Sequence, residues 1–162
     1  MNIQVSTFSG ITDNDGVIFA EDNTILIVCT KAHEAYMIPD GVISIVHGAF
    51  MGSKELKSIT LPDSLEHIGE DVFRDCTGIT SIVLPNGIEM IEYGAFWDCI
   101  NLANVTIPDG IKYVGEYAFH GCESLQSVVF KGKTYNTIIR DCYNNRKGRD
   151  LPQEFYDDVN GK

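Results

Sequence analysis

A strict 23-residue repeat runs through the middle of the chain. Each period carries one phenylalanine at the same position: Phe50, Phe73, Phe96 and Phe119. An Ile-Pro or Leu-Pro pair recurs with the same spacing, at residues 38–39, 61–62, 84–85 and 107–108. A fixed period of roughly 20–50 residues is the sequence signature of a repeat architecture. Because one such unit cannot bury its apolar side chains alone, the units are expected to stack into a continuous solenoid.

Each period predicts a short strand, a turn and a second, briefer element. The segment 56–62 has apolar residues at Leu56, Ile59 and Leu61 and ends at a proline, which cannot donate to a strand ladder. The tripeptides that follow, such as Pro-Asp-Gly, favour a turn. The second half of a period is too short for a long helix, so a brief strand or 3₁₀ segment is expected. The first-half strands are predicted at residues 34–38, 57–61, 80–84, 103–107 and 126–130.

The pattern L-x-x-I-x-L-P-x-x-[VLI]-x-x-I-x-x-x-A-F-x-x-C resembles the BspA-type (treponemal) leucine-rich-repeat family over roughly residues 33–130. The departures are mild: Val72 replaces the alanine before Phe73, and Ser53 stands where later periods have cysteine. The resemblance implies an α/β leucine-rich-repeat solenoid, β-dominated and right-handed. It also implies about four to five coils with a parallel β-sheet on the concave side. A binding role, often at bacterial surfaces, and no chemistry of its own are further implications.

The segments that flank the repeats predict caps within a single domain of 162 residues. Residues 1–32 are expected to form an N-terminal β-hairpin cap, with strands at 17–20 and 24–28. Residues 33–130 form the repeats, and residues 131–162 form a basic C-terminal cap and tail. In that last segment a short helix is expected from Thr134 to about Asn145, and the end from Asp157 onward is expected to be frayed.

The charge of the chain is unevenly distributed. The net charge is −11, with 18 acids against 5 bases up to residue 130 and 6 bases against 1 acid over residues 131–149. An acidic body disfavours direct nucleic-acid binding, because it repels phosphates, and leaves basic protein partners open. The sequence contains no apolar run long enough for a membrane span and no secretory signal. A cytoplasmic location is therefore expected, or the cell surface or the medium if a leader precedes this sequence.

The cysteines and histidines give no sign of a cofactor, a metal site or an enzyme. Cys76, Cys99 and Cys122 occupy one column of the repeat and are expected to stack as buried, reduced thiols. A metal site lacks the usual C-x-x-C or Cys/His spacing, and a disulfide within the column would need Cβ vectors that do not run parallel. No catalytic serine, histidine or carboxylate constellation is recognisable.

Aromatic residues gather in the second half of the third and fourth periods. Stacking of the coils would bring six side chains onto one flank: Met90, Tyr93, Trp97, Tyr113, Tyr117 and His120. Trp97 is expected to turn outward or toward the next coil and to leave part of its indole accessible. Because tryptophan and tyrosine are common binding anchors, this flank is the predicted partner-binding site. Packing against the C-terminal segment, and binding through the smooth Ser/Thr/Val sheet instead, are the alternatives.

Two functions fit these features. The first is a non-enzymatic protein–protein interaction module, of the binding or adhesion type, that uses the solenoid surface. The second is an acidic inhibitor or decoy that occupies a basic nucleic-acid-binding site on a target protein. A decoy held by charge would lose affinity steeply as ionic strength rises, whereas an aromatic contact would lose much less.

Overall fold

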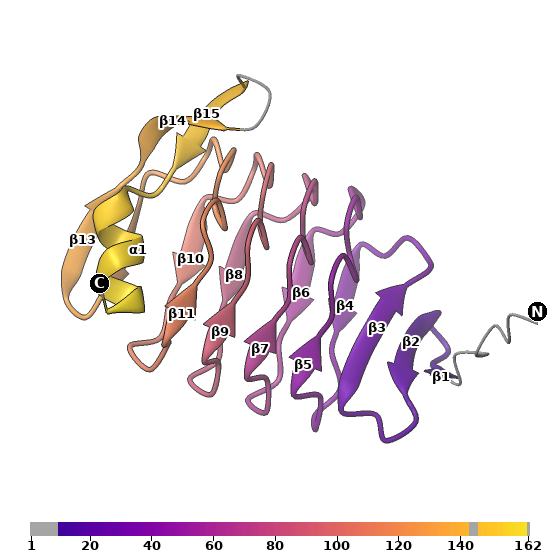
Figure 1. The fold of residues 1–162 in the computed structure, drawn as a ribbon. Helices are drawn as coiled ribbons and strands as arrows, with labels where there is room; N and C mark the ends of the chain where they lie inside the picture. Colours follow the sequence, from indigo (N-terminus) through magenta and orange to yellow (C-terminus); the bar gives the residue numbers. More distant parts are fainter. Residues whose placement is uncertain (1–9, 143–145, 162) are drawn as a thin grey trace, which may run out of the picture.

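The computed structural model describes residues 10–142 and 146–161. Within these residues the chain winds into a solenoid of about four turns that repeats every 23 residues. Successive coils lie side by side along the molecule, with the N-terminal strands at one end and the C-terminal elements at the other (Figure 1). This arrangement confirms the stacked repeat that the period of the sequence predicts.

The first half of each period forms a short strand at the predicted place. These strands are β4 (Ala35–Met37), β6 (Ser58–Thr60), β8 (Ser81–Val83), β10 (Asn104–Thr106) and β12 (Ser127–Phe130). β4 pairs in parallel with β6, and β8 pairs in parallel with β10. Over the described residues no ladder joins β6 to β8 or β10 to β12, so this face consists of separate pairs rather than one sheet.

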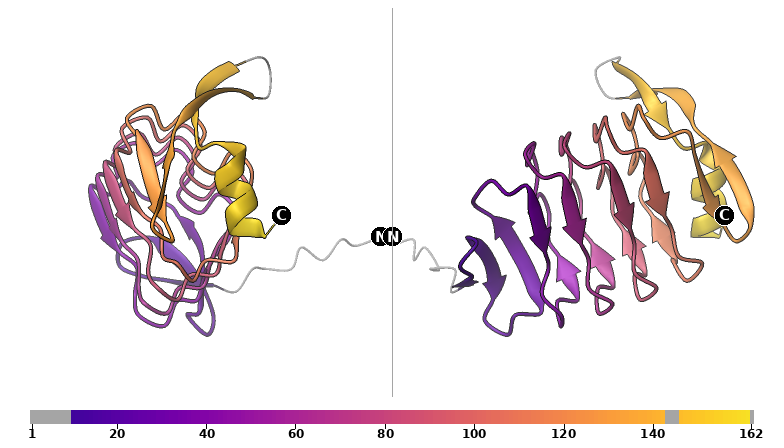
Figure 2. Two further views of the ribbon diagram at one scale, coloured as in Figure 1. Left: turned by 90° about the vertical axis from the view of Figure 1, so that its left-hand side faces the viewer. Right: turned by 180° about the vertical axis from the view of Figure 1, so that it is seen from behind.

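The second half of each period builds the more continuous sheet. Its strands have two residues each: β5 (Ser44–Ile45), β7 (His67–Ile68), β9 (Met90–Ile91) and β11 (Tyr113–Val114). They extend in parallel from three N-terminal strands, β1 (Gly10–Thr12), β2 (Val17–Ala20) and β3 (Ile25–Cys29). β2 and β3 pair antiparallel, which confirms the predicted hairpin. The result is a seven-stranded sheet in the order β1-β2-β3-β5-β7-β9-β11 (Figure 1). Figure 2 shows the stacked coils from one end and from behind.

Phenylalanine rings form the spine of the core. Phe50, Phe73, Phe96 and Phe119 are buried, and neighbouring rings stack with centroids 5.2–5.4 Å apart. The buried cysteines stack beside them, and each thiol donates a hydrogen bond to a backbone carbonyl of the preceding coil. The Sγ–O distance is 3.0 Å from Cys76 to Phe50 and from Cys99 to Phe73. The repeat therefore places the ring contact between all four coils and the thiol contact in the three coils that carry the cysteine.

One turn position adopts the left-handed backbone conformation in all four coils. Its φ angle is +65° at Gly48, +52° at Asp71, +63° at Gly94 and +58° at Tyr117. Glycine has no Cβ to clash in this conformation, and aspartate tolerates it better than most residues. Tyrosine has a Cβ and a bulky ring, and it rarely adopts this conformation, so the fourth coil carries backbone strain at Tyr117.

The C-terminal segment differs from the prediction in two respects. The predicted helix from 134 to 145 is wrong: this region holds β13 (Lys133–Asn136) and β14 (Ile138–Cys142), while residues 143–145 lie outside the described part. β13 pairs antiparallel with β12, so it satisfies the last edge of the first-half strands. The β-branched residues Thr134, Ile138 and Ile139 also favour extended structure. β14 pairs in turn with β15 (Arg146–Asp150).

The expected fraying is also wrong for residues 157–161, while Lys162 lies outside the described part. A helix, α1 (Gln153–Asn160), lies against the last coil, and Phe155, Tyr156 and Val159 on it are buried. Gly161 caps the helix in the left-handed conformation. The apolar face of α1 covers the end of the core, and this burial holds the helix in place.

Candidate partner-binding surface

Four of the six predicted site residues form one cluster of rings. Tyr93 contacts Trp97 and Tyr117, and His120 contacts Trp97 and Tyr117, with ring centroids 5.6–5.9 Å apart. The Trp97 and Tyr117 rings are 6.0 Å apart. The stacking of the third and fourth coils therefore brings these side chains together, as the 23-residue spacing predicts.

The cluster is less accessible than the sequence suggests. Trp97 is 5% exposed and His120 is 2% exposed, so the expectation that part of the indole remains accessible is wrong. The guanidinium of Arg74, one coil earlier in the same column, lies 4.4 Å from the centre of the indole. His120 meets the indole from the following coil. A residue in the middle of a stacked column has a neighbour on each side, and for this reason Trp97 is enclosed.

The C-terminal cap covers the far side of the cluster. The Arg140 guanidinium on β14 lies 4.8 Å from the ring centre of Tyr117, in a cation–π contact. Buried Asp150 at the end of β15 lies 3.7 Å from both the His120 Nδ1 atom and an Arg140 nitrogen. The hydroxyl of Tyr156 on α1 donates a 2.7 Å hydrogen bond to the Asp150 carboxylate. Contact with the C-terminal segment, the alternative reading of the aromatic flank, thus accounts for the buried side of the cluster.

The remaining predicted site residues lie on the outside of the seven-stranded sheet. Met90 on β9 and Tyr113 on β11 are direct neighbours in the parallel register. Met90 is 37% exposed, Tyr113 is 39% exposed and Tyr93 is 36% exposed, while the alternate residues Ile91 and Val114 are fully buried. These three side chains, called the exposed triad below, present apolar and aromatic surface to solvent.

Acidic side chains surround the exposed triad. Glu92 lies 3.4 Å from the His67 Nε2 atom, and Glu89 forms an ion pair with Lys112 on the next coil. Glu70 lies 3.9 Å from the His47 ring. Glu66 and Glu116 are exposed, and over the described residues neither forms an ion pair. Sequence reasoning did not single out these glutamates, although Glu70 and Glu116 lie one period before and one period after Tyr93.

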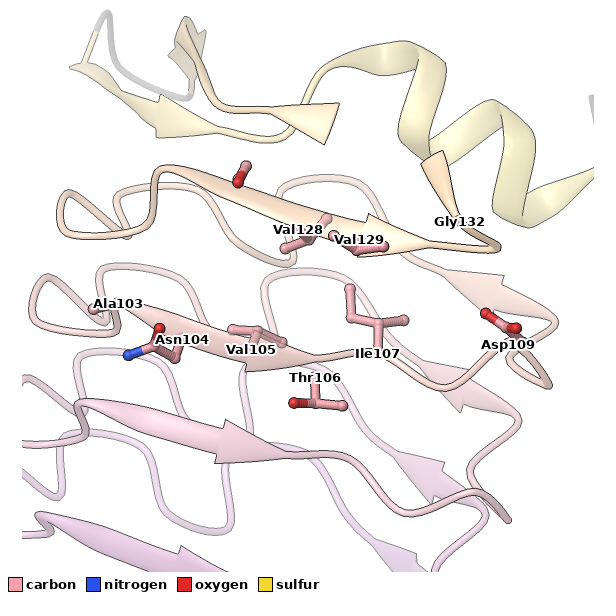
Figure 3. Close-up of a pocket in the computed structure, with 10 residues that line it drawn as sticks. Ala103, Asn104, Val105, Thr106, Ile107, Asp109, Val128, Val129 and Gly132 are labelled. Atoms are coloured by element: carbon pink, nitrogen blue, oxygen red, sulfur yellow. The ribbon is translucent and has the colours of Figure 1, made fainter. Parts of the chain in front are cut away.

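The first-half strands carry a second surface with different chemistry. Two grooves lie where neighbouring strands share no ladder. One, of about 320 Å³, lies between β6 and β8. The other, of about 590 Å³, lies between β10 and β12 and is the one drawn in Figure 3. Eight of the lining positions match two periods apart, as with Thr60 and Thr106. The grooves offer hydroxyl, amide and apolar groups, with Val83 67% exposed and Val129 56% exposed. They contain no aromatic side chain.

The chemistry of the buried cysteines fits packing rather than reaction. Burial raises the pKa of Cys76 to about 12 and raises the pKa values of Cys99 and Cys122 well above their usual range. A thiol in this state is neutral at pH 7, and the thiolate is the form that attacks substrates and binds metals. Among residues 10–142 and 146–161, no group of three or more His, Cys, Asp or Glu side chains is arranged to hold a metal ion.

No helix in the described part of the chain is long and apolar enough to cross a membrane.

Comparison with known proteins agrees with the architecture. The family of BspA type leucine rich repeat regions matches residues 29–148 in six copies. The pneumococcal vaccine antigen PcpA is 32% identical with a TM-score of 0.70, over 75% of this chain and 30% of that protein. A leucine rich cell surface protein from Faecalibacterium prausnitzii is 24% identical with a TM-score of 0.54, over 77% of this chain and 40% of that protein, and shares the fold. The curated proteins give no significant match.

This chain therefore spans less than half the length of either structural relative. The family is one of generally non-enzymatic repeat proteins, typical of interaction and adhesion modules. With the repeat, the stacked coils and the matched residues in agreement, the chain belongs to the BspA-type leucine-rich-repeat family.

Proposed function

We propose that this chain is a non-enzymatic module that binds another protein through the exposed triad of Met90, Tyr93 and Tyr113. The observation that carries the proposal is the exposure of three large side chains, each 36–39%: Met90 and Tyr113 on adjacent strands, and Tyr93 in the turn that follows β9. Tyrosine is enriched at binding hot spots, because it combines a large contact area with a polar tip. Met90 and Tyr113 stand on paired strands whose alternate residues, Ile91 and Val114, are buried, so little backbone entropy is lost on binding.

The other three residues of the predicted flank have a supporting role in this proposal. Trp97 and Tyr117 contact the Tyr93 ring, and His120 packs against both of them. In this proposal these contacts hold the Tyr93 ring in one orientation. A ring that is fixed before binding loses less freedom when the partner arrives. The partner therefore contacts Tyr93 directly and depends on the buried rings only through it.

Location on a cell surface or in the medium is part of the proposal. Its support is the pneumococcal relative, which is described as a vaccine antigen and shares 32% identity over three quarters of this chain. The decoy hypothesis gains no support from these relatives, because none of them is described as a nucleic-acid mimic or an inhibitor.

The test compares two surfaces of the same protein. Tyr93→Ala combined with Tyr113→Ala removes most of the exposed triad, and Thr60→Ala combined with Val83→Ala alters the first-half strands instead. Each immobilised variant is exposed to surface proteins of the source cell, and the bound proteins are quantified against the parent after equal thermal stability has been verified. We expect a bound protein to be lost with the tyrosine pair and retained with the Thr60/Val83 pair. If the bound protein is instead retained with the tyrosine pair and lost with the Thr60/Val83 pair, the binding site lies on the first-half strands.

A further inference from the structure

The column that contains Tyr93 alternates acid, aromatic, acid over three successive coils. The backbone N–H of Asp71 donates to the Tyr93 carbonyl at 3.1 Å, and that of Gly94 donates to the Glu116 carbonyl at 3.3 Å. These bonds join adjacent coils, so Glu70 lies on one side of Tyr93 and Glu116 on the other. Both glutamates are exposed. A partner that covers the Tyr93 ring must also cover or pass close to both carboxylates.

The column next to that of Met90 contains Glu66, Glu89 and Lys112 in successive coils. The backbone N–H of Glu89 donates to the Glu66 carbonyl at 2.8 Å, and that of Lys112 donates to the Glu89 carbonyl at 2.9 Å. The Lys112 ammonium is paired with Glu89, so it does not neutralise Glu66. Within the described residues, Glu66, Glu70 and Glu116 have no lysine or arginine partner. The exposed triad therefore lies beside three carboxylates that no lysine or arginine side chain pairs with.

This charge decides what kind of partner the surface accepts. Burying an ionised carboxylate without a counter-charge costs far more than burying an aromatic ring gains. An apolar or acidic partner would meet that cost at Glu70 and Glu116 whenever it covered Tyr93. A basic partner offsets the cost with charge-assisted hydrogen bonds, and an arginine can also stack on the tyrosine face.

The repeat sets the spacing of the basic groups. Neighbouring coils stack about 4.8 Å apart, so the backbone positions of Glu70 and Glu116, two coils apart, are separated by about 9.6 Å. An extended polyproline II segment advances about 3.1 Å per residue and returns to the same face after three residues, at about 9.3 Å. Basic residues at i and i+3 of such a segment therefore match the two glutamates, with the segment crossing Tyr93 between them.

We propose that the exposed triad and its glutamates recognise an extended cationic segment of a protein partner, with basic side chains at three-residue intervals. This inference rests on the proposed function, because it names the chemistry of the partner that the same surface binds.

The test uses two blocked nonapeptides of identical composition and charge. The first has arginine at positions 1, 4 and 7 and proline elsewhere, and the second has its three arginines at positions 1–3 followed by six prolines. Each peptide carries a fluorescent label and is titrated with the full chain, with binding followed by anisotropy. We expect the spaced peptide to bind several-fold more tightly than the clustered one. Equal affinities of the two peptides would refute the three-residue spacing of the basic side chains. If neither peptide binds, the proposal that the partner is a cationic segment is wrong.

The salt dependence and a pair of isosteric variants test the charges themselves. The association rate of the spaced peptide should fall about tenfold or more between 0.02 and 0.5 M salt. Glu70→Gln combined with Glu116→Gln should weaken the spaced peptide several-fold. Glu21→Gln combined with Glu55→Gln removes the same charge from exposed positions elsewhere and should have little effect. Equal losses in the two variants would show general attraction to an acidic body and would overturn the site.

The outcomes separate this inference from the proposed function. If neither peptide binds but the tyrosine pair still loses its protein partner, the cationic segment is wrong and the protein-binding surface stands. If peptide binding requires Glu70 and Glu116 but the tyrosine pair retains every partner, the acidic site is real and the proposed role of the exposed triad is wrong.

Discussion

The side-chain amide of Asn160 hydrogen-bonds both backbone groups of Val114. Its Nδ2 atom donates to the Val114 carbonyl at 3.0 Å, and the Val114 N–H donates to its Oδ1 atom at 2.8 Å. Val114 belongs to β11, the last strand of the seven-stranded sheet. An edge strand leaves such groups unpaired and open to pairing with another chain. The last turn of α1 thus supplies, from one side chain, the two bonds that a further strand would have made.

Replacing Asn160 with alanine should destabilise the C-terminal end. Two partly buried backbone groups lose their partners, and each unsatisfied group costs about 1–3 kcal/mol, less where water can replace the amide. We expect a fall of about 1–3 kcal/mol in the free energy of unfolding, measured by urea denaturation. Asn104→Ala, at an exposed position on β10, serves as the control and should leave the midpoint almost unchanged. An unchanged midpoint for Asn160→Ala would refute the edge-capping role.

Substitutions at Tyr117 should reverse the usual order of alanine and glycine. The backbone there has a φ of +58°, and a Cβ in this conformation costs roughly 1–2 kcal/mol that glycine avoids. Tyr117→Gly should therefore be more stable than Tyr117→Ala by about 1 kcal/mol, as measured by thermal or urea unfolding. The same pair of substitutions at Tyr93, whose φ is not positive, should give the ordinary order with alanine more stable. If Tyr117→Ala is more stable than Tyr117→Gly, the backbone at this position is not strained.

The stacked thiols should make stability fall at high pH. Burial raises the pKa of Cys76 to about 12 and those of Cys99 and Cys122 well above the usual range, whereas an unfolded cysteine titrates near 8.5. Above about pH 9 the unfolded chain loses these protons and the folded chain keeps them, so rising pH favours unfolding. Each thiol can contribute up to about 1.4 kcal/mol per pH unit in that range.

The measurement is the urea midpoint at pH 8 and at pH 10. Cys99→Ala should show a smaller fall between the two values than the parent, because one of the three raised thiols is absent. Identical falls in the parent and the variant would mean that this column does not carry the effect.

Phe96→Ala should be among the most destabilising single substitutions. The Phe96 ring is fully buried and stacks between Phe73 at 5.2 Å and Phe119 at 5.3 Å. Loss of a buried aromatic ring of this kind costs about 3–5 kcal/mol. Met51→Ala, at a side chain 55% exposed in the first coil, should cost little and provides the comparison. If the two variants unfold at the same denaturant concentration, the phenylalanine spine does not hold the coils together.

The contrast between Trp97 and Phe96 shows how much of the candidate site can be predicted from the sequence. The burial of Phe96 follows from its column, because the same residue recurs at the same place in every period and must face the shared core. Trp97 has Met51, Arg74 and His120 at the equivalent positions, so its column predicts neither burial nor exposure. Its burial depends on Arg74 and His120 from the adjacent coils, and on the cap that covers His120. The gathering of the rings was predictable, but their accessibility was not.

The sequence by itself determined the coil, because a period of 23 residues with apolar columns in phase can bury those columns only by stacking unit on unit. It also determined the first-half strands, the phenylalanine spine and the buried thiols. Each of these recurs at the same position of several periods, so the same local preference acts in each coil and points to the same conformation. The tertiary structure alone decided the C-terminal end, where β13, β14, β15 and α1 depart from the repeat and take their conformation from the open edges they cover. It likewise decided which aromatic side chains face solvent, because that depends on neighbours contributed by other coils rather than on local preference.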